Sequence, residues 1–206
     1  MIERTIIPGP CAANTERQMF MSGEMIAAVA FTLLGEVSRK KIILGLRGPG
    51  TKETTSPRDD GWTGPHEDGF IWLFKTSKHF DLMPATEIVS IDEAKIVALL
   101  CKAMNINELF IWFGSRLSKG IVIRDATEIL MGVPNLNLKV GIKNPSDGSI
   151  KSWKGRFDWL KDLNLDPKKQ LFAIDRGRTP LEGEPNPDNL RNLPLHHTTQ
   201  QIINEF

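Results

Sequence analysis

The 206-residue chain is 40% apolar and carries 26 lysines and arginines against 25 aspartates and glutamates, which leaves a net charge of +1. A chain of this length buries one sizeable core without disulfides or a structural metal, so we expect a single domain over residues 1–206. The balanced charge, with no dense basic run, excludes the electrostatic footprint of a nucleic-acid binder. The charge balance is still compatible with a small anionic ligand that is bound by a few local cations.

Cysteine usage and hydropathy exclude two further classes. Cys11 and Cys101 lie far apart in unlike contexts, which is not the pattern of a secreted disulfide framework, so we expect a reducing, cytoplasmic environment. The start of the chain lacks a signal-peptide pattern, and no apolar stretch reaches the roughly 18 residues that a membrane span needs. We therefore expect no membrane partner.

Short apolar runs alternate with longer segments of helical period along the chain. The runs that predict strands cover residues 5–11, 41–47, 84–89, 109–113, 138–142 and 170–174. Helices are predicted over 15–34, 67–80, 90–104, 152–163 and 198–206. A further helix is predicted to end at residue 131. This alternation predicts six βα units and an α/β fold.

Local signals refine this prediction. Thr15 with Gln18, and Ser90 with Glu93, have the spacing of helix capping boxes. Residues 48–66 form a long polar stretch without periodicity, which is typical of a functional or disordered loop. The glycines at 45–50 lack the spacing of a nucleotide-binding fingerprint. The pattern alone leaves an open doubly wound sheet and a closed barrel as alternatives.

The residues at the ends of the predicted strands are the strongest functional signal. They are four cations, one carboxylate and one thiol: Cys11, Arg47, Glu87, Arg116, Lys143 and Arg176. The carboxyl ends of parallel strands share one rim, where barrel enzymes place their chemistry. Cations gathered there predict a site for a multiply anionic substrate, since arginine binds carboxylate and phosphate through two hydrogen bonds. The alternative is that each charge simply meets solvent at a strand end.

At these residues the sequence resembles the class I 3-deoxy-D-arabino-heptulosonate 7-phosphate (DAHP) synthases, along almost the whole chain. The similar segments are Gly-Pro-Cys-Ala at 9–12, Leu-Arg at 46–47, Thr-Glu-Ile-Val at 86–89, Trp-Phe-Gly-Ser-Arg at 112–116, the Val-Gly-Ile-Lys-Asn stretch at 140–148 and Asp-Arg-Gly at 175–177. The resemblance implies a (β/α)8 TIM barrel of which about six of the eight βα units are present. The family's later metal-ligating strands have no counterpart, so we expect a C-terminally incomplete domain.

The resemblance also implies an activity. DAHP synthases condense phosphoenolpyruvate with erythrose 4-phosphate in an aldol-type reaction, the first step of the shikimate pathway to aromatic amino acids. It implies that Arg47, Arg116, Lys143 and Arg176 bind phosphoenolpyruvate, with Lys143 catalytic and Glu87 beside them. Cys11 would ligate a divalent metal such as Mn, Fe, Zn or Co. The full-length form would be a homo-oligomer.

The residues expected to bind the second substrate, the acceptor sugar, match the family less well. The family's Lys-Pro-Arg-Thr loop has no clean counterpart, and Lys52 and Arg58 are the nearest candidates for contacts with the acceptor sugar. The alternatives are a related 3-deoxy-octulosonate 8-phosphate or sialic acid synthase, or a phosphate-binding relic without turnover. Because strands that would complete the barrel and metal site are not recognisable, we expect this polypeptide by itself to be inactive and poorly stable.

Overall fold

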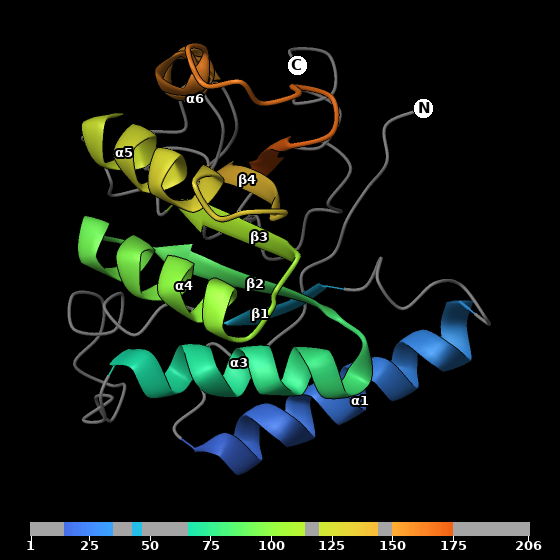
Figure 1. Ribbon diagram of the computed structural model, residues 1–206. Coiled ribbons are helices and arrows are strands. Elements are labelled where there is room, and N and C mark those ends of the chain that lie inside the picture. The colour runs from blue at the N-terminus through green and yellow to red at the C-terminus, as the bar shows by residue number, and fades with distance from the viewer. Residues whose placement is uncertain (1–14, 35–42, 47–65, 114–119, 144–149, 175–206) are drawn as a thin grey trace, which may run out of the picture.

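The computed structural model describes residues 15–34, 43–46, 66–113, 120–143 and 150–174 (Figure 1). Within these ranges five strands form one parallel sheet: β1 (Ile43–Leu46), β2 (Met83–Ile88), β3 (Glu108–Phe113), β4 (Asn137–Lys143) and β5 (Leu171–Ile174). They match five of the six predicted strands. The remaining one, at 5–11, lies outside the described residues.

The order of the strands in the sheet decides between the two α/β alternatives. The order is β1-β2-β3-β4-β5, the same as the order along the chain. Every crossover therefore moves in one direction, as in a TIM barrel, whereas a doubly wound sheet reverses its direction at a switch point. The described strands form part of a barrel wall.

The helices also follow the prediction. They are α1 (Glu16–Leu34), α3 (His66–Phe80), α4 (Ile91–Ala103), α5 (Gly120–Met131) and α6 (Ile150–Phe157), followed by the 3₁₀ turn η2 (Asp158–Leu160). The helix predicted over 152–163 is thus shorter than expected, because the chain tightens to i→i+3 hydrogen bonds at Asp158. The segment predicted as a helix at 198–206 lies outside the described part of the chain.

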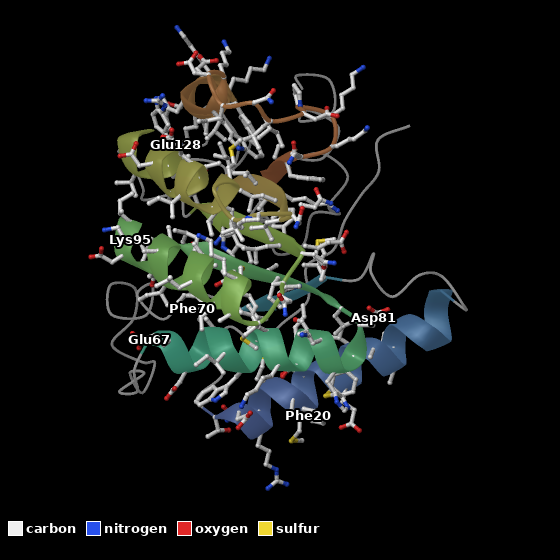
Figure 2. All side chains as sticks on the ribbon, in the orientation of Figure 1. Phe20, Glu67, Phe70, Asp81, Lys95 and Glu128 are labelled. Atoms are coloured by element: carbon white, nitrogen blue, oxygen red, sulfur yellow. The ribbon has the colours of Figure 1, made fainter. Side chains whose placement is uncertain are left out.

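One face of the sheet packs against helices. On β3, Leu109, Ile111 and Phe113 are buried in the same core as Phe70 and Phe74 of α3. Figure 1 shows α3, α4 and α5 side by side along this face. Charged side chains such as Lys95 of α4 and Glu128 of α5, labelled in Figure 2, are exposed on these helices. Burial of apolar surface on this face is the main source of stability.

The other face of the sheet, here called the inner face, carries a smaller cluster. It consists of the strand residues Ile43, Met83, Ala85, Phe110 and Trp112, with Phe172 and Ile174 of β5 packed against them. These residues alternate with those of the larger core, because successive side chains of a strand point to opposite faces. The sheet is therefore buried on both sides, as a barrel wall requires.

Two helix-to-strand turns position β2 and β3. Asp81 and Asn105 adopt φ values of 55° and 51° just after α3 and α4. The following N–H groups reach back into the helices: Leu82 donates to the Ser77 carbonyl at 2.8 Å, and Ile106 to the Cys101 carbonyl at 2.9 Å. This is the Schellman closure, with Asp or Asn where glycine is commonest. It turns the chain directly into the next strand; Asp81 is labelled in Figure 2.

Helix α1 lies along α3 through a close contact. A Cβ added to Gly23 would come within 2.3 Å of Thr76 Cγ2 and 3.0 Å of the Phe80 ring. At the start of α1 the Gln18 N–H donates to Thr15 Oγ1 at 3.2 Å, which is the predicted cap. Among the helices that the structure describes, none is long and apolar enough to cross a membrane.

Candidate functional site

A charged pair lies at the carboxyl end of the inner face. Glu87, the last residue but one of β2, follows Met83 and Ala85 in the inner-face alternation, and Lys143 ends β4. Lys143 Nζ lies 3.0 Å from Glu87 Oε1. The Glu87 side chain is only 2% exposed and that of Lys143 19%. Glu87 and Lys143, the two candidate site residues within the described ranges, thus lie together at the strand ends, where the sequence pattern places them.

Trp112 of β3 lies between the two strands that carry this pair. The parallel register places it beside Glu87 on one side and Gly141 on the other. Lys143 Nζ stands 5.4 Å from the centroid of the Trp112 ring. The lysine therefore crosses over β3 and its indole to reach a carboxylate two strands away. This distance falls within the range of a cation–π contact.

Burial makes this pair different from a surface salt bridge. Removing a carboxylate from water costs several kcal/mol unless a partner compensates, and Lys143 provides that cation for Glu87. The alternative of charges that merely meet solvent therefore does not describe Glu87. Lys143 keeps part of its side chain exposed at the strand ends, whereas its partner Glu87 is almost completely buried.

The backbone around the pair is fixed by hydrogen bonds from the helix side. The Trp153 indole of α6 donates to the carbonyl of Ile142, the residue before Lys143, at 2.8 Å. Beyond β2, the Val89 N–H donates to the Glu93 carboxylate at 2.8 Å, and the Glu93 N–H donates to Ser90 Oγ at 3.2 Å. The predicted cap at Ser90 is thereby confirmed. Both strand ends are held in place.

Gly141 has a steric role on the inner face. A Cβ at this position would come 2.3 Å from Ile174 Cδ1 and 2.9 Å from Phe110 Cε1. The missing side chain lets these two residues pack beside Trp112 in the row that leads to Lys143. The glycine of the Val-Gly-Ile-Lys segment is therefore explained by packing against β3 and β5.

Six of the residues predicted from the sequence lie outside the described ranges: Cys11, Arg47, Lys52, Arg58, Arg116 and Arg176. Their roles stay predictions from the sequence. The sequence pattern does not assign a role to Trp112, because it singles out the charged residue at the end of the Trp-Phe-Gly-Ser-Arg segment. Its signal was an aromatic side chain at an inner-face position beside Glu87.

The described residues do not supply a metal site. Across these ranges no group of three or more His, Cys, Asp and Glu side chains could hold a metal ion. Cys101 is buried on the helix-covered face, where desolvation raises the pKa of its thiol to about 12. The predicted metal ligand, Cys11, lies outside the described residues.

Comparison with solved structures identifies the architecture. The chain is similar to a phospho-2-dehydro-3-deoxyheptonate aldolase (DAHP synthase) from Thermotoga maritima, with a TM-score of 0.58 and 15% identity over 82% of this chain and 40% of that one. A truncated form of the same organism's DAHP synthase matches with a TM-score of 0.58 and 16% identity over 86% of this chain and 56% of that one. The likeness establishes the fold.

This chain therefore has an α/β barrel-type fold like that of DAHP synthases, as predicted. It spans between two fifths and just over half of the length of these solved structures. No family model and no curated protein matches the sequence. The fold is thus shared with these synthases, while the activity has to be argued from the site.

Proposed function

We propose that this chain carries the phosphoenolpyruvate-binding part of a DAHP synthase-like enzyme, which condenses phosphoenolpyruvate with erythrose 4-phosphate. The observation that supports this most is the Glu87–Lys143 pair, a buried carboxylate holding a partly accessible ammonium at the carboxyl end of a barrel wall. Barrel enzymes place their substrates at this rim. The proposal extends to the full chain, 1–206, as part of one synthase domain.

In this proposal Lys143 neutralises the substrate and holds it in position. Phosphoenolpyruvate carries a phosphate and a carboxylate close together, and an ammonium oriented in advance by Glu87 stabilises that charge without having to reorganise. Arg47, Arg116 and Arg176 are proposed to bind the remaining oxygens from neighbouring strand ends. Carbon 3 of phosphoenolpyruvate then attacks the acceptor aldehyde, water adds at carbon 2, and phosphate leaves.

Calorimetric titration of the 206-residue protein with phosphoenolpyruvate tests the binding step. Lys143→Met should weaken binding about tenfold to a hundredfold, since a hydrogen bond from a charged group contributes about 1.5–3 kcal/mol. Lys139→Met is the matched control, because Lys139 lies on the same strand and the same face but four residues away. Equal affinities of wild type and Lys143→Met would contradict the proposal.

Turnover needs a separate experiment. Phosphate release from phosphoenolpyruvate by the full-length form is measured with erythrose 4-phosphate, arabinose 5-phosphate or N-acetylmannosamine as acceptor, each with and without Mn²⁺. Release that requires erythrose 4-phosphate and metal supports the synthase, and Cys11→Ser should then abolish this metal-dependent release. Binding without release for any acceptor would support the phosphate-binding alternative. Equal release without metal would contradict the predicted metal requirement.

A further inference from the structure

Trp112 carries a buried donor that the proposed mechanism does not use. The residue is 8% exposed, and its indole Nε1 has no hydrogen-bond partner in the described part of the chain. A tryptophan N–H can only donate, and when buried it usually finds a partner. Leaving a buried donor unpaired is unfavourable. This donor, which has no partner among the described residues, could be satisfied by an acceptor atom of a bound ligand.

A second tryptophan shows how a buried indole N–H is usually hydrogen-bonded. Trp153, fully buried on the helix-covered face, donates its indole N–H to the Ile142 carbonyl at 2.8 Å. The Trp153 indole of α6 and the Trp112 indole of β3 thus lie on opposite faces of the sheet. Of the two, Trp112 is the one whose indole N–H lacks a partner among the described residues.

The position of Trp112 tells which partner is expected. Its ring lies under the Lys143 ammonium, at 5.4 Å from the centroid, and its strand position is directly beside Glu87. A ligand anion that binds Lys143 at the rim brings acceptor oxygens to the neighbourhood of this indole. Carboxylate and phosphate oxygens are strong acceptors for such a donor.

We propose that Trp112 is a ligand-contacting residue of this site: its indole N–H donates a hydrogen bond to an oxygen of the bound anion. Its ring face meanwhile holds the Lys143 ammonium in position through the cation–π contact. The inference rests on the proposed function, since the anion is phosphoenolpyruvate. In this proposal β3 supplies a neutral hydrogen-bond donor, Trp112, that lies between the charged residues of β2 and β4.

Nuclear magnetic resonance of the wild-type protein with ¹⁵N-labelled tryptophan tests this contact. On saturation with phosphoenolpyruvate, the Trp112 indole proton should move downfield because it gains a hydrogen bond. The Trp153 indole, already bonded to Ile142, should move far less. Inorganic phosphate serves as a second probe, and a shift with it assigns the phosphate end to Trp112. The resonance is identified by its loss in Trp112→Phe, or by sequential assignment if that variant does not fold.

Affinity measurements supply an independent readout. Trp112→Phe keeps an aromatic face but removes the N–H and should weaken phosphoenolpyruvate binding about fivefold to tenfold. Trp112→Leu removes both contacts and should weaken it further. A merely structural role would lower the melting temperature and leave the affinity of the folded fraction unchanged.

The outcomes separate this inference from the function on which it rests. If phosphoenolpyruvate binds in a Lys143-dependent way while the Trp112 indole does not move, the role of Trp112 is wrong and the proposed function stands. If phosphoenolpyruvate does not bind at all, both are wrong. A downfield shift of Trp112 with a stationary Trp153 supports both.

Discussion

The two faces of the sheet differ in how their polarity changes along the strands. The helix-covered face ends in apolar residues: on β2 its last residue, Ile88, is fully buried in the larger core. The inner face begins with apolar residues such as Met83 and ends with the charged Glu87. Neighbouring residues of one strand are thus both buried, yet one serves packing and the other carries a charge. A functional site is expected only on the inner face, where the strands change from apolar to charged residues.

The largest effect is expected from breaking the helix-covered face. Phe74→Ala removes a fully buried ring between α3 and the sheet, which should lower the free energy of unfolding by about 3–5 kcal/mol. Leu99→Ala is the control, because Leu99 is 67% exposed on α4 and should change stability by less than about 0.5 kcal/mol. Urea denaturation followed by circular dichroism measures both. Similar losses in the two variants would contradict the assignment of the core.

Removing the charged pair on the inner face should lower the free energy of unfolding somewhat less. Lys143→Met removes the ammonium that lies 3.0 Å from the buried Glu87 carboxylate, which should lower the free energy of unfolding by about 3 kcal/mol. Adding Glu87→Gln removes the buried charge and should restore part of the loss. A double-mutant cycle in urea measures this coupling. Strictly additive single and double variants would show that the pair contributes nothing.

Two glycine substitutions test how closely the helices pack outside the sheet. Gly23→Ala places a methyl group against Thr76 and Phe80, and overpacking should destabilise the protein by about 1–3 kcal/mol. Gly155→Ala, in α6 with nothing within 4 Å, should stabilise by up to about 1 kcal/mol, since alanine favours helix. Thermal melts decide: effects of the same sign would argue against the close approach of α1 and α3.

The smallest effect concerns Cys101 and pH. Burial raises the pKa of its thiol from 9.0 to about 12, so the folded state disfavours the thiolate. The stability that this provides is present below about pH 9 and is lost as pH rises toward 12, at about 1.4 kcal/mol per pH unit. Urea midpoints at pH 8 and 10 should therefore diverge more for wild type than for Cys101→Ala. Identical pH dependence would contradict the burial of the thiol.

Regular packing was the part of the fold that sequence pattern predicted well. Short apolar runs located the five described strands, and helical periodicity located α3, whose Phe70, Leu73 and Phe74 the structure shows to be buried. The end of α6 was predicted too late. Its change to a 3₁₀ turn comes with a local bond from the Lys161 N–H to the Asp158 carbonyl and with burial of Leu160 in the larger core, neither of which is visible in the periodicity.

The site was predicted in part. Strand ends bring Glu87 and Lys143 to one rim, a consequence of parallel topology that the sequence already implied. That Lys143 crosses over Trp112 depends on the register of three strands, which is a property of pairing rather than of any one segment. Six other candidates, including Cys11 and Arg176, stay predictions because they lie outside the described ranges.

The bond from Trp153 to the Ile142 carbonyl links the site to a remote surface. Lys143 follows Ile142 directly, so the backbone that carries the ammonium is held by a helix on the opposite face of the sheet. Changes in α6 that shift Trp153 would then move the cation without altering any residue at the rim. Random or directed variation in this helix offers a way to tune ligand affinity while every ligand-contacting side chain is preserved.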